Sequence, residues 1–488
     1  MAAKKIIIFL VLMLITATVS WLLYTAAIPT QSPWLAVLQR TRPLVQLQHN
    51  DVADIVIVGG GIAGIITAYY LLQESSHNII ILEKDKVAHG ATGHNAGQLT
   101  AYFEKPLHSL VREFGFAAAI AAQQAVESAW SLLDDVYATV RPATPLYKCT
   151  GYIGCTSWQQ VEDFLASHQE RVRGNLPVNP CFIADDVQIP IAIHRQYHGS
   201  YTLIKRNKMN SLLITKDKEY IAVVAMQQGC LNSAQLTEEI ATYISKQYAN
   251  RCRIYEQSAV THVHLQEHGA TLAVRKHTIN AKRVILCTNG FEQYTITNGN
   301  NGAINTKLHH TVIGKIGYMM AVAVAAQNRV TTTISYLRGP DKHKRSWFNV
   351  PYFYCTIRPF WMAEQPTITT LLALGGLDEL WLEGKYYSAQ EPYPSICKQR
   401  LYNFFSEHIY PMFSYRPERW FYWHGLMGYT PTGIRRIGPE PCNPTLLYNL
   451  GCNGIGILPS IYGGKKIAGF IQGKTFEPSL FDPADSRC

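Results

Sequence analysis

Three glycines near the start of the chain have the spacing of a turn that binds a dinucleotide. Gly59, Gly61 and Gly64 form the pattern G-x-G-x-x-G directly after a short apolar segment, residues 55–58. In such a turn the first glycine permits a tight bend and the second lets the backbone approach a pyrophosphate. The third lets a helix pack closely against the preceding strand. The spacing therefore predicts a strand, a phosphate-binding turn and a helix in succession.

An acidic residue beyond the expected helix, residues 62–72, completes this pattern. A second apolar strand, residues 78–82, ends at Glu83, 24 residues after Gly59. A carboxylate there is placed to accept hydrogen bonds from an adenosine ribose, while the amides at the helix N-terminus face the phosphates. In this context we predict a dinucleotide site rather than a tight turn without a ligand. Its expected contacts are Gly59, Gly61, Ile62, Ala63, Gly64, Glu83 and Lys84.

A second glycine-rich loop follows the acidic residue. "GATGHNAGQL", residues 90–99, has three glycines with Thr, His and Asn set among them. One turn needs only one or two glycines, so we expect this loop to approach another group closely while keeping short polar side chains. A nicotinamide site would not need such a loop, which favours FAD as the dinucleotide.

This loop resembles that of the FAD-dependent amine and amino-acid oxidoreductases. The family includes D-amino-acid oxidase, glycine oxidase, sarcosine and dimethylglycine dehydrogenases and γ-glutamylputrescine oxidase. Its loop has the form G-A-S/T-G-R-N-G/A-G-Q and lies along the flavin and its pyrophosphate. The matching positions here are Gly90, Ala91, Thr92, Gly93, Asn95, Gly97 and Gln98.

His94 departs from this form, because many members of the family carry Arg there. In dimethylglycine-type dehydrogenases a loop of the form W-H-A-A-G-L carries a His bonded covalently to the flavin, and "HNAGQL" aligns with it. The resemblance therefore leaves two roles for His94. It either forms a covalent bond to the flavin or donates a hydrogen bond near the phosphates.

The resemblance continues nearly to the end of the chain. "AKRVILCTNGF" resembles a strand and turn beside the cofactor, and "LYNLGCNGIGILPS" resembles the C-terminal flavin segment, which enters a helix facing the pyrimidine end of the flavin. A positive helix end there would stabilise charge on the reduced flavin. The further FAD contacts that the resemblance implies are Val260 (beside adenine), Thr288, Asn289, Gly290, Gly451, Asn453, Gly454, Ile455, Gly456 and Ile457.

The fold that the resemblance implies is α/β, with two discontinuous domains. We expect a doubly wound, Rossmann-type FAD-binding domain from residues 53–145, 220–295 and 420–488. A mixed β-sheet substrate domain, residues 146–219 and 296–419, would be interleaved with it and lie over the flavin. Tyr354 is a candidate for the substrate pocket, since Tyr352 and Tyr354 share one face of a probable strand.

A departure from the family concerns the substrate. Glycine-oxidase-like members have W-A-G-L-R-P-G-T-x-D-G before the C-terminal segment, and its Arg binds the substrate carboxylate. This chain has "WHGLMGYTPTG", so Met427 takes the place of the Arg. The stretch is closer to that of γ-glutamylputrescine oxidases, which favours an amine substrate. Arg358 or Arg435 would restore a carboxylate clamp from another direction, which keeps an amino-acid substrate open.

The resemblance implies that a hydride passes from the C–H bond beside an amine to flavin N5. The resulting imine is hydrolysed by water, and oxygen or a quinone reoxidises the flavin. Two alternatives remain: an amino-acid or N-methyl-amino-acid oxidase or dehydrogenase, and a non-catalytic, membrane-tethered flavoprotein. A disulfide reductase is disfavoured because the chain has no CxxC and no second G-x-G-x-x-G. No Cys/His set has metal-ligand spacing, so no metal is expected.

Composition and the N-terminus bear on location. Of the 488 residues, 47% are apolar and 16% are charged. The net charge is +10, but the sequence has no block of like charges, so nucleic-acid binding is not indicated. The eleven cysteines are expected to be free thiols. Residues 6–28 carry no charge, which predicts a single-pass membrane anchor over residues 1–28, with a cleaved signal peptide as the alternative. Residues 29–52 have the composition of a linker, and the flanking charges leave the membrane orientation open.

Overall fold

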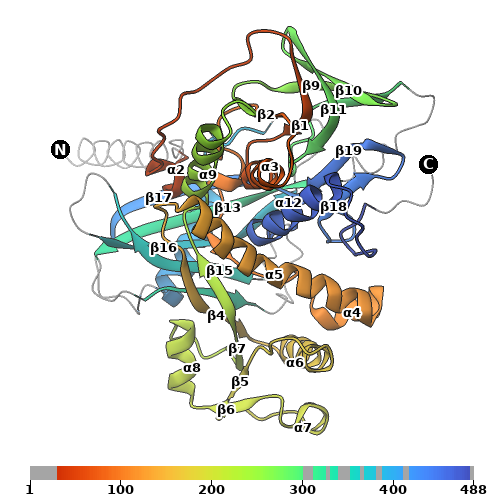
Figure 1. Ribbon diagram of the computed structural model, residues 1–488. Helices are drawn as coiled ribbons and strands as arrows, with labels where there is room; N and C mark the ends of the chain where they lie inside the picture. The colour runs from red at the N-terminus through yellow and green to blue at the C-terminus, as the bar shows by residue number, and fades with distance from the viewer. Residues whose placement is uncertain are drawn as a thin grey trace, which may run out of the picture.

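The computed structural model describes residues 30–299, 312–325, 330–338, 352–362, 368–380, 387–409, 411 and 417–483. Within these residues two large sheets are joined by helices that lie between them (Figure 1). The predicted anchor, residues 1–28, lies outside this part of the chain. No helix among the described residues is long and apolar enough to cross a membrane.

The first sheet contains the parallel strands that the glycine turn predicted. Its order is β12-β9-β10-β11-β1-β2-β8, with β19 beside β11 and β18 beside β19. The parallel strands are β1 (Asp51–Val58), β2 (Ile79–Leu82), β8 (Cys252–Tyr255), β11 (His277–Leu286) and β19 (Asn443–Leu450). The remaining strands are β9 (Val260–Gln266), β10 (Gly269–Val274), β12 (Thr295–Asn298) and β18 (Arg436–Glu440), which pair antiparallel except for the parallel pair of β12 and β9. All four residues of β2 are apolar and buried, as expected for a parallel strand that is covered on both faces.

Four helices cover the face of this sheet that looks toward the second one. They are α3 (Ile62–Glu74), α5 (Phe116–Val140), α9 (Ser233–Gln247) and α12 (Ile457–Ile471) (Figure 1). Their buried side chains form one core with Met319, Ala321 and Trp423 of the second sheet. This shared core fixes the two layers against each other, as burial of apolar surface requires. The short α4 (Leu107–Phe114) leads into α5.

The second sheet is mixed and has the order β17-β13-β16-β15-β14-β4-β7-β5-β6, with β3 paired to β7. Its strands are β3 (Gln98–Leu99), β4 (Tyr147–Cys155), β5 (Cys181–Ala184), β6 (Thr202–Ile204), β7 (Ala222–Cys230), β13 (Ile313–Ala325), β14 (Thr332–Leu337), β15 (Tyr352–Phe360), β16 (Thr369–Leu380) and β17 (Pro417–Tyr429). The helix α11 (Ser395–Phe404) and the π-helical turn Phe405–Ile409 cover its outer face. Helices α6 (Trp158–Arg173), α7 (Ile191–Tyr197) and α8 (Arg206–Leu213) surround the β5–β6 end (Figure 1).

The strand membership differs from two of the predicted boundaries. The segment 220–295 was expected in the FAD-binding domain, yet its first strand, β7, pairs with β4 and β5 in the second sheet. The segment 420–488 likewise begins within β17, which pairs with β13. Both strands are apolar and precede a strand or helix of the first layer, so composition alone does not show which sheet they join.

The predicted linker, residues 29–52, is packed against the first layer rather than free. It contains a one-turn helix, α2 (Pro33–Ala36), which Ser32 caps. Trp34 and Leu47 are buried, with 0% and 2% of their surface exposed. The expectation of free thiols is also corrected at one position, because Cys442 is disulfide-bonded.

Candidate active site

The glycine turn after β1 has the close contacts that its pattern predicts. Gly59 has φ = 110°, a conformation that favours glycine, and a Cβ there would lie 2.6 Å from the carbonyl oxygen of Cys287. A Cβ on Gly64 would lie 1.9 Å from the carbonyl oxygen of Gly59. These two glycines therefore allow the tight bend and the close approach of α3 to β1.

Two helices begin at this edge of the first sheet without a side-chain cap. The N-cap residues are Gly61 for α3 and Gly456 for α12, and neither helix has a side-chain cap hydrogen bond. By contrast, Ser157 caps α6 and Asn232 caps α9. Uncapped N-terminal amides are suited to an anionic ligand such as a pyrophosphate. Both helices follow parallel strands that flank β11, at the carboxyl edge where doubly wound sheets bind nucleotides.

Glu83 lies at the end of β2, as expected, and its carboxylate is held in place by backbone amides. The N–H groups of Gly60 and Asp85 donate to its two oxygens at 2.7 and 2.9 Å. Burial raises the pKa of this carboxyl. Each oxygen keeps a second lone pair, so the side chain suits the predicted hydrogen bonds to a ribose. The backbone of Ser258 donates to the carbonyl of Glu83, which brings the start of β9, with Val260, to the same side.

Asn95 fixes the shape of the second glycine-rich loop. Its side-chain amide donates to the carbonyl of Thr92 at 2.9 Å and its side-chain oxygen accepts from the backbone of Gly97 at 2.7 Å. The Thr92 hydroxyl accepts from the amide of Ile62 at 3.0 Å, which ties the loop to the start of α3. The Gln98 side chain donates to the carbonyl of Cys355 in the second sheet. The loop therefore connects the two layers.

His94 is half-buried where this loop meets β17. Its Nδ1 lies 2.9 Å from the carbonyl oxygen of Gly90, which favours the tautomer that leaves Nε2 unprotonated. Burial lowers the pKa of His94 to about 4. The side chain is therefore a neutral imidazole at physiological pH, not the cation that an Arg would supply.

The turn after β11 joins three segments of the predicted FAD site. Asn289 has φ = 54°, and its side-chain oxygen accepts from the amides of Gly428 at 3.2 Å and Cys452 at 3.0 Å. A Cβ on Gly290 would lie 2.9 Å from the carbonyl oxygen of Met427. Thr288, next to them, is 3.0 Å from the Tyr294 hydroxyl. The predicted residues Thr288, Asn289 and Gly290 are thus brought to the C-terminal segment.

A second asparagine shapes that C-terminal segment. The side-chain oxygen of Asn453 accepts from the amide of Thr430 at 2.7 Å, and its side-chain amide donates to the carbonyl of Gly451 at 3.1 Å. Gly451, Asn453 and Gly454 all have positive φ. This turn leads through Ile455 and Gly456 into α12 at Ile457, which places the whole predicted set at one helix N-terminus.

The second sheet has glycines at several positions of the face that looks toward this edge. Gly317 of β13 pairs with Gly425 of β17, and Gly375 of β16 pairs with Tyr354 of β15. The Tyr354 ring lies over Gly375, with its hydroxyl 3.2 Å from the sulfur of Met319. The predicted pocket residue Tyr354 therefore faces the first layer, together with Met319.

Met427 also lies on this face. Its terminal methyl would be 2.9 Å from a Cβ on Gly317, so the side chain covers that glycine. Lys315 pairs directly opposite Met427 and forms an ion pair with Asp378 at 3.4 Å. An apolar side chain thus stands where glycine-oxidase-like sequences have an arginine.

Glu104 is a residue of this site that sequence reasoning missed. Its carboxylate oxygen would clash with a Cβ on Gly454 at 1.7 Å, and the Tyr429 hydroxyl lies 3.5 Å away. Burial raises the pKa of this carboxyl to about 7, although Lys315 opposes the shift. The side chain is exposed, and its charge raises the pKa of the Tyr352 and Tyr354 hydroxyls. Its proximity to the flavin segment follows only from the fold.

Arg358 and Arg435, the two predicted alternatives for binding a substrate carboxylate, contact groups of the protein itself. The Arg358 guanidinium is buried and lies 5.5 Å from the ring centre of Trp34 and 5.1 Å from that of Tyr147. Arg435 donates to the side-chain oxygen of Asn449 at 2.7 Å and to its carbonyl at 3.0 Å. Burial lowers the pKa of Arg435 to about 10. Among the described residues, no three or more His, Cys, Asp or Glu side chains form a group that could hold a metal ion.

Comparison with known proteins gives partial matches to curated relatives. A putative Rieske 2Fe-2S iron-sulfur protein, YhfW of Bacillus subtilis, is 24% identical over 248 residues, which are 50% of this chain and 41% of that protein. Gamma-glutamylputrescine oxidoreductase of Escherichia coli is 28% identical over 86 residues, 18% and 20% of the two chains. Human mitochondrial dimethylglycine dehydrogenase is 41% identical over 58 residues, 12% and 7%. The matches span less than half the length of each of these relatives.

Solved structures match over much more of the chain. Glycine oxidase from Geobacillus kaustophilus has a TM-score of 0.62 at 17% identity, covering 89% of this chain and 99% of that one. L-proline dehydrogenase from P. horikoshii has a TM-score of 0.61 at 14% identity, covering 90% and 98%. At these identities the likeness establishes the fold, with its FAD-binding and substrate domains. The family model described as "FAD dependent oxidoreductase" matches residues 54–469, so the chain belongs to this family, whose cofactor is FAD.

Proposed function

We propose that this protein oxidises the C–N bond of an amine, rather than that of a free α-amino acid, to an imine. The observation that carries the proposal is the composition of the sheet face beside the flavin segments. Met427 occupies the position of the carboxylate-binding arginine, and the carboxylate of Glu104 lies 3.5 Å from the hydroxyl of Tyr429, two residues further along β17. The partial similarity to gamma-glutamylputrescine oxidoreductase supports this choice.

The contacts of the two candidate arginines strengthen the case against a carboxylate substrate. Arg358 lies near two aromatic rings, with its Nη1 unpaired among the described residues, and Arg435 is bound to Asn449. At the position of Met427 a substrate carboxylate would lose its water without gaining a guanidinium partner. Such desolvation costs several kcal/mol, in the range of about 2–7 kcal/mol for an unpaired polar group and more for a charge. An amine avoids this cost.

The chain's own residues have to bind and orient the substrate. Bound FAD would supply the acceptor for the hydride. Gly61 and the first turns of α3 and α12 would hold its phosphates and its pyrimidine end through backbone amides. Tyr354 and Met319 would form an apolar wall that excludes water from the reacting carbon. Glu104 would receive a second ammonium group at the far end of the substrate.

The electron acceptor and the location belong to the proposal as well. We propose oxygen or a quinone as acceptor, and a membrane anchor over residues 1–28 would favour the quinone. The anchor rests on the uncharged stretch of residues 6–28, which is long enough to cross a bilayer.

A second candidate is the oxidation of an N-methyl amino acid. The similarity to human dimethylglycine dehydrogenase, together with His94 in the loop, favours this alternative. A non-catalytic flavoprotein is the candidate of another class, because FAD-binding segments do not by themselves require turnover.

An anaerobic reduction experiment separates these candidates. The purified protein is mixed with a panel of diamines, monoamines, glycine, D-amino acids and N-methyl amino acids, and the flavin absorbance near 450 nm is followed. Bleaching by amines alone supports the proposal, and bleaching by N-methyl amino acids alone supports the second candidate. Efficient reduction by glycine or simple D-amino acids, with none by amines, would overturn the proposal. An absence of reduction throughout would favour the non-catalytic flavoprotein.

A further inference from the structure

The segment before β1 contacts the second glycine-rich loop directly. We define residues 30–47 as the N-terminal strap. The Ser32 hydroxyl donates to the carbonyl of Gly93, and the Trp34 indole N–H donates to the carbonyl of Asn95 at 2.6 Å. Both acceptors are backbone carbonyls of the loop that would lie along the flavin. The strap therefore determines where those carbonyls point.

Two of the three glycines in that loop lie against the strap. A Cβ on Gly93 would lie 2.5 Å from the carbonyl oxygen of Ala88 and 2.7 Å from the side chain of Leu35, and a Cβ on Gly97 would lie 2.7 Å from the carbonyl oxygen of Leu231 and 2.9 Å from the ring of Trp34. Gly90 has only an ordinary contact at 3.8 Å. The close approach that the loop's composition predicts is therefore made in part by residues of this chain. The strap and the loop fit each other as two packed surfaces.

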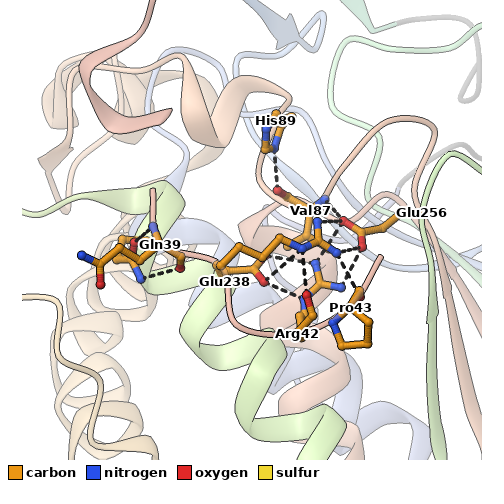
Figure 2. Close-up of polar contacts among 9 residues, drawn as sticks. Gln39, Arg42, Pro43, Val87, His89, Glu238 and Glu256 are labelled. Carbon is orange, nitrogen blue, oxygen red and sulfur yellow. Dashed lines mark hydrogen bonds and ion pairs between the residues drawn. The ribbon is translucent and has the colours of Figure 1, made fainter. Parts of the chain in front are cut away.

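A buried ion-pair network fixes the other end of the strap (Figure 2). Arg42 contacts Glu238 and Glu256 at 2.8 Å each, and Arg40 donates to Glu256 at 2.8 Å. Glu256 in turn accepts from the amide of Val87 at 2.6 Å. Val87 stands at the start of the segment that leads into the glycine-rich loop. The strap therefore holds this segment, residues 87–97, at both ends.

The charges of this network favour its formation. Both glutamates are buried, with 0% of Glu256 and 1% of Glu238 exposed. Burial alone would raise the pKa of Glu256, but the hydrogen bonds from Arg40, Arg42 and Val87 outweigh it and lower the pKa to about 2. Removing the arginines would leave two buried carboxylates without a cationic partner, which is strongly unfavourable.

We infer that the N-terminal strap positions residues 87–97 for FAD, so that Ser32 and Trp34 act as positioning residues for the cofactor. The inference goes beyond the proposed substrate and rests only on the proposed place of the loop along FAD. Without the two hydrogen bonds the loop carbonyls lose their fixed direction, and FAD has to order the loop when it binds. Part of the binding free energy is then spent on that ordering.

The test compares conservative variants of the full chain in a His94→Asn background, so that no bond through His94 retains the flavin. Ser32→Ala combined with Trp34→Phe removes both hydrogen bonds and keeps the aromatic ring. Gln39→Ala is the matched control, because Gln39 meets Gln235 through its backbone N–H and carbonyl. The measurements are FAD dissociation, from the recovery of flavin fluorescence on dilution, and the melting temperature of each protein after removal of FAD.

We expect the double variant to release FAD about tenfold faster than the control, since two neutral hydrogen bonds contribute about 1–2 kcal/mol and 1.4 kcal/mol is a factor of ten. Its FAD-free melting temperature should fall below that of the control, because Trp34→Phe leaves a cavity at a buried ring and Ser32→Ala also removes the cap of α2, so the release rates are compared well below both melting temperatures. Equal release rates for the two proteins would overturn the inference, and so would a lowered melting temperature with an unchanged release rate. The Gly61→Val variant distinguishes a wrong strap inference from a wrong FAD site. If Gly61→Val retains FAD, the predicted phosphate site is wrong. If Gly61→Val loses FAD while the double variant releases it as slowly as the control, only the strap inference is wrong.

Discussion

Gly425 lies directly against the backbone of His94. A Cβ placed on Gly425 would be 2.7 Å from the carbonyl oxygen of His94 and 2.9 Å from its Cβ. One residue comes from the loop of the first layer and the other from β17 of the second sheet. The contact therefore fixes how closely the second sheet approaches the loop predicted to bind the flavin, and it leaves no room for a side chain between them.

Gly425→Ala should displace this loop and lower the FAD content of the purified protein. The added methyl group must move either the His94 backbone or β17 by several tenths of an ångström, which costs about 1–3 kcal/mol in a packed core. We expect at least a fivefold loss of bound FAD, measured from the ratio of absorbance at 450 and 280 nm. Gly473→Ala is the control, because a Cβ there has nothing within 4 Å and introduces only local backbone strain. Equal FAD content in the two variants would contradict the prediction.

Gly61→Val should place a branched side chain where the pyrophosphate is proposed to lie. A Cβ at this position already meets the Thr92 hydroxyl at 3.0 Å, so the larger side chain has no alternative space. The wild-type protein should be yellow with about one FAD per chain, and the variant colourless or insoluble. Acid extraction and quantification of flavin decide the matter, and full FAD content in soluble variant protein would rule out the proposed site.

His94 is predicted to control the acid stability of the FAD-free protein. Burial lowers its pKa to about 4 from the usual 6.5, so between these values the unfolded chain binds a proton that the folded chain does not. Stability should therefore fall as the pH is lowered from 6.5 to 4, by at most about 1.4 kcal/mol per pH unit. Urea unfolding across this range should show a shallower dependence in His94→Gln. His268→Gln serves as the control, since 89% of that side chain is exposed, and an identical pH dependence in both variants would refute the assignment.

Covalent attachment of the flavin at His94 stays open and has a direct test. The Nδ1 contact with Gly90 leaves Nε2 available, so the bond would form through Nε2. Precipitation of the protein with acid leaves a non-covalent flavin in the supernatant and a covalent one in the pellet. His94→Asn should move the colour to the supernatant only if the bond exists.

The local motifs of the sequence predicted the strand, turn and helix at Gly59–Gly64, and the fold added what those motifs do not contain. Gly59 and Gly64 make their contacts within one strand–turn–helix unit, so their spacing was sufficient to predict them. Glu104 approaches Gly454 only because two distant segments meet at the sheet edge, and no local pattern predicts that contact. The strap was mistaken for a linker because its prolines and glutamines outweighed the signals of Trp34 and Arg42, whose partners lie about 60 and 200 residues away.

The predicted membrane segment is tested by truncation. Deleting residues 1–29 should release soluble protein that retains FAD, because the deletion ends before Ser32 and Trp34 and leaves the strap contacts intact. The measurement is the distribution of FAD-loaded protein between the membrane pellet and the supernatant after cell lysis. A native N-terminus near Ala27 in the full-length product would instead identify a cleaved signal peptide.

Glu104→Gln should weaken the binding of diamines more than that of monoamines. With a pKa of about 7 the Glu104 carboxyl is neutral in acid and ionised above pH 7, so the KM for a diamine should fall as the pH rises through 7 in the wild-type protein. A charge-assisted hydrogen bond contributes about 1.5–3 kcal/mol when buried. Because this side chain is open to water, we expect the lower part of that range, which is about a tenfold increase in KM with kcat changed much less.

Glu113→Gln is the matched control, since Glu113 pairs with Lys105 on the surface with 43% of its side chain exposed. Steady-state kinetics from pH 6 to 8.5 should show that the pH dependence of KM disappears in Glu104→Gln and persists in Glu113→Gln. A diamine KM that is unchanged in Glu104→Gln would remove Glu104 from substrate recognition and leave Met427 as the only support for an amine substrate at this sheet face.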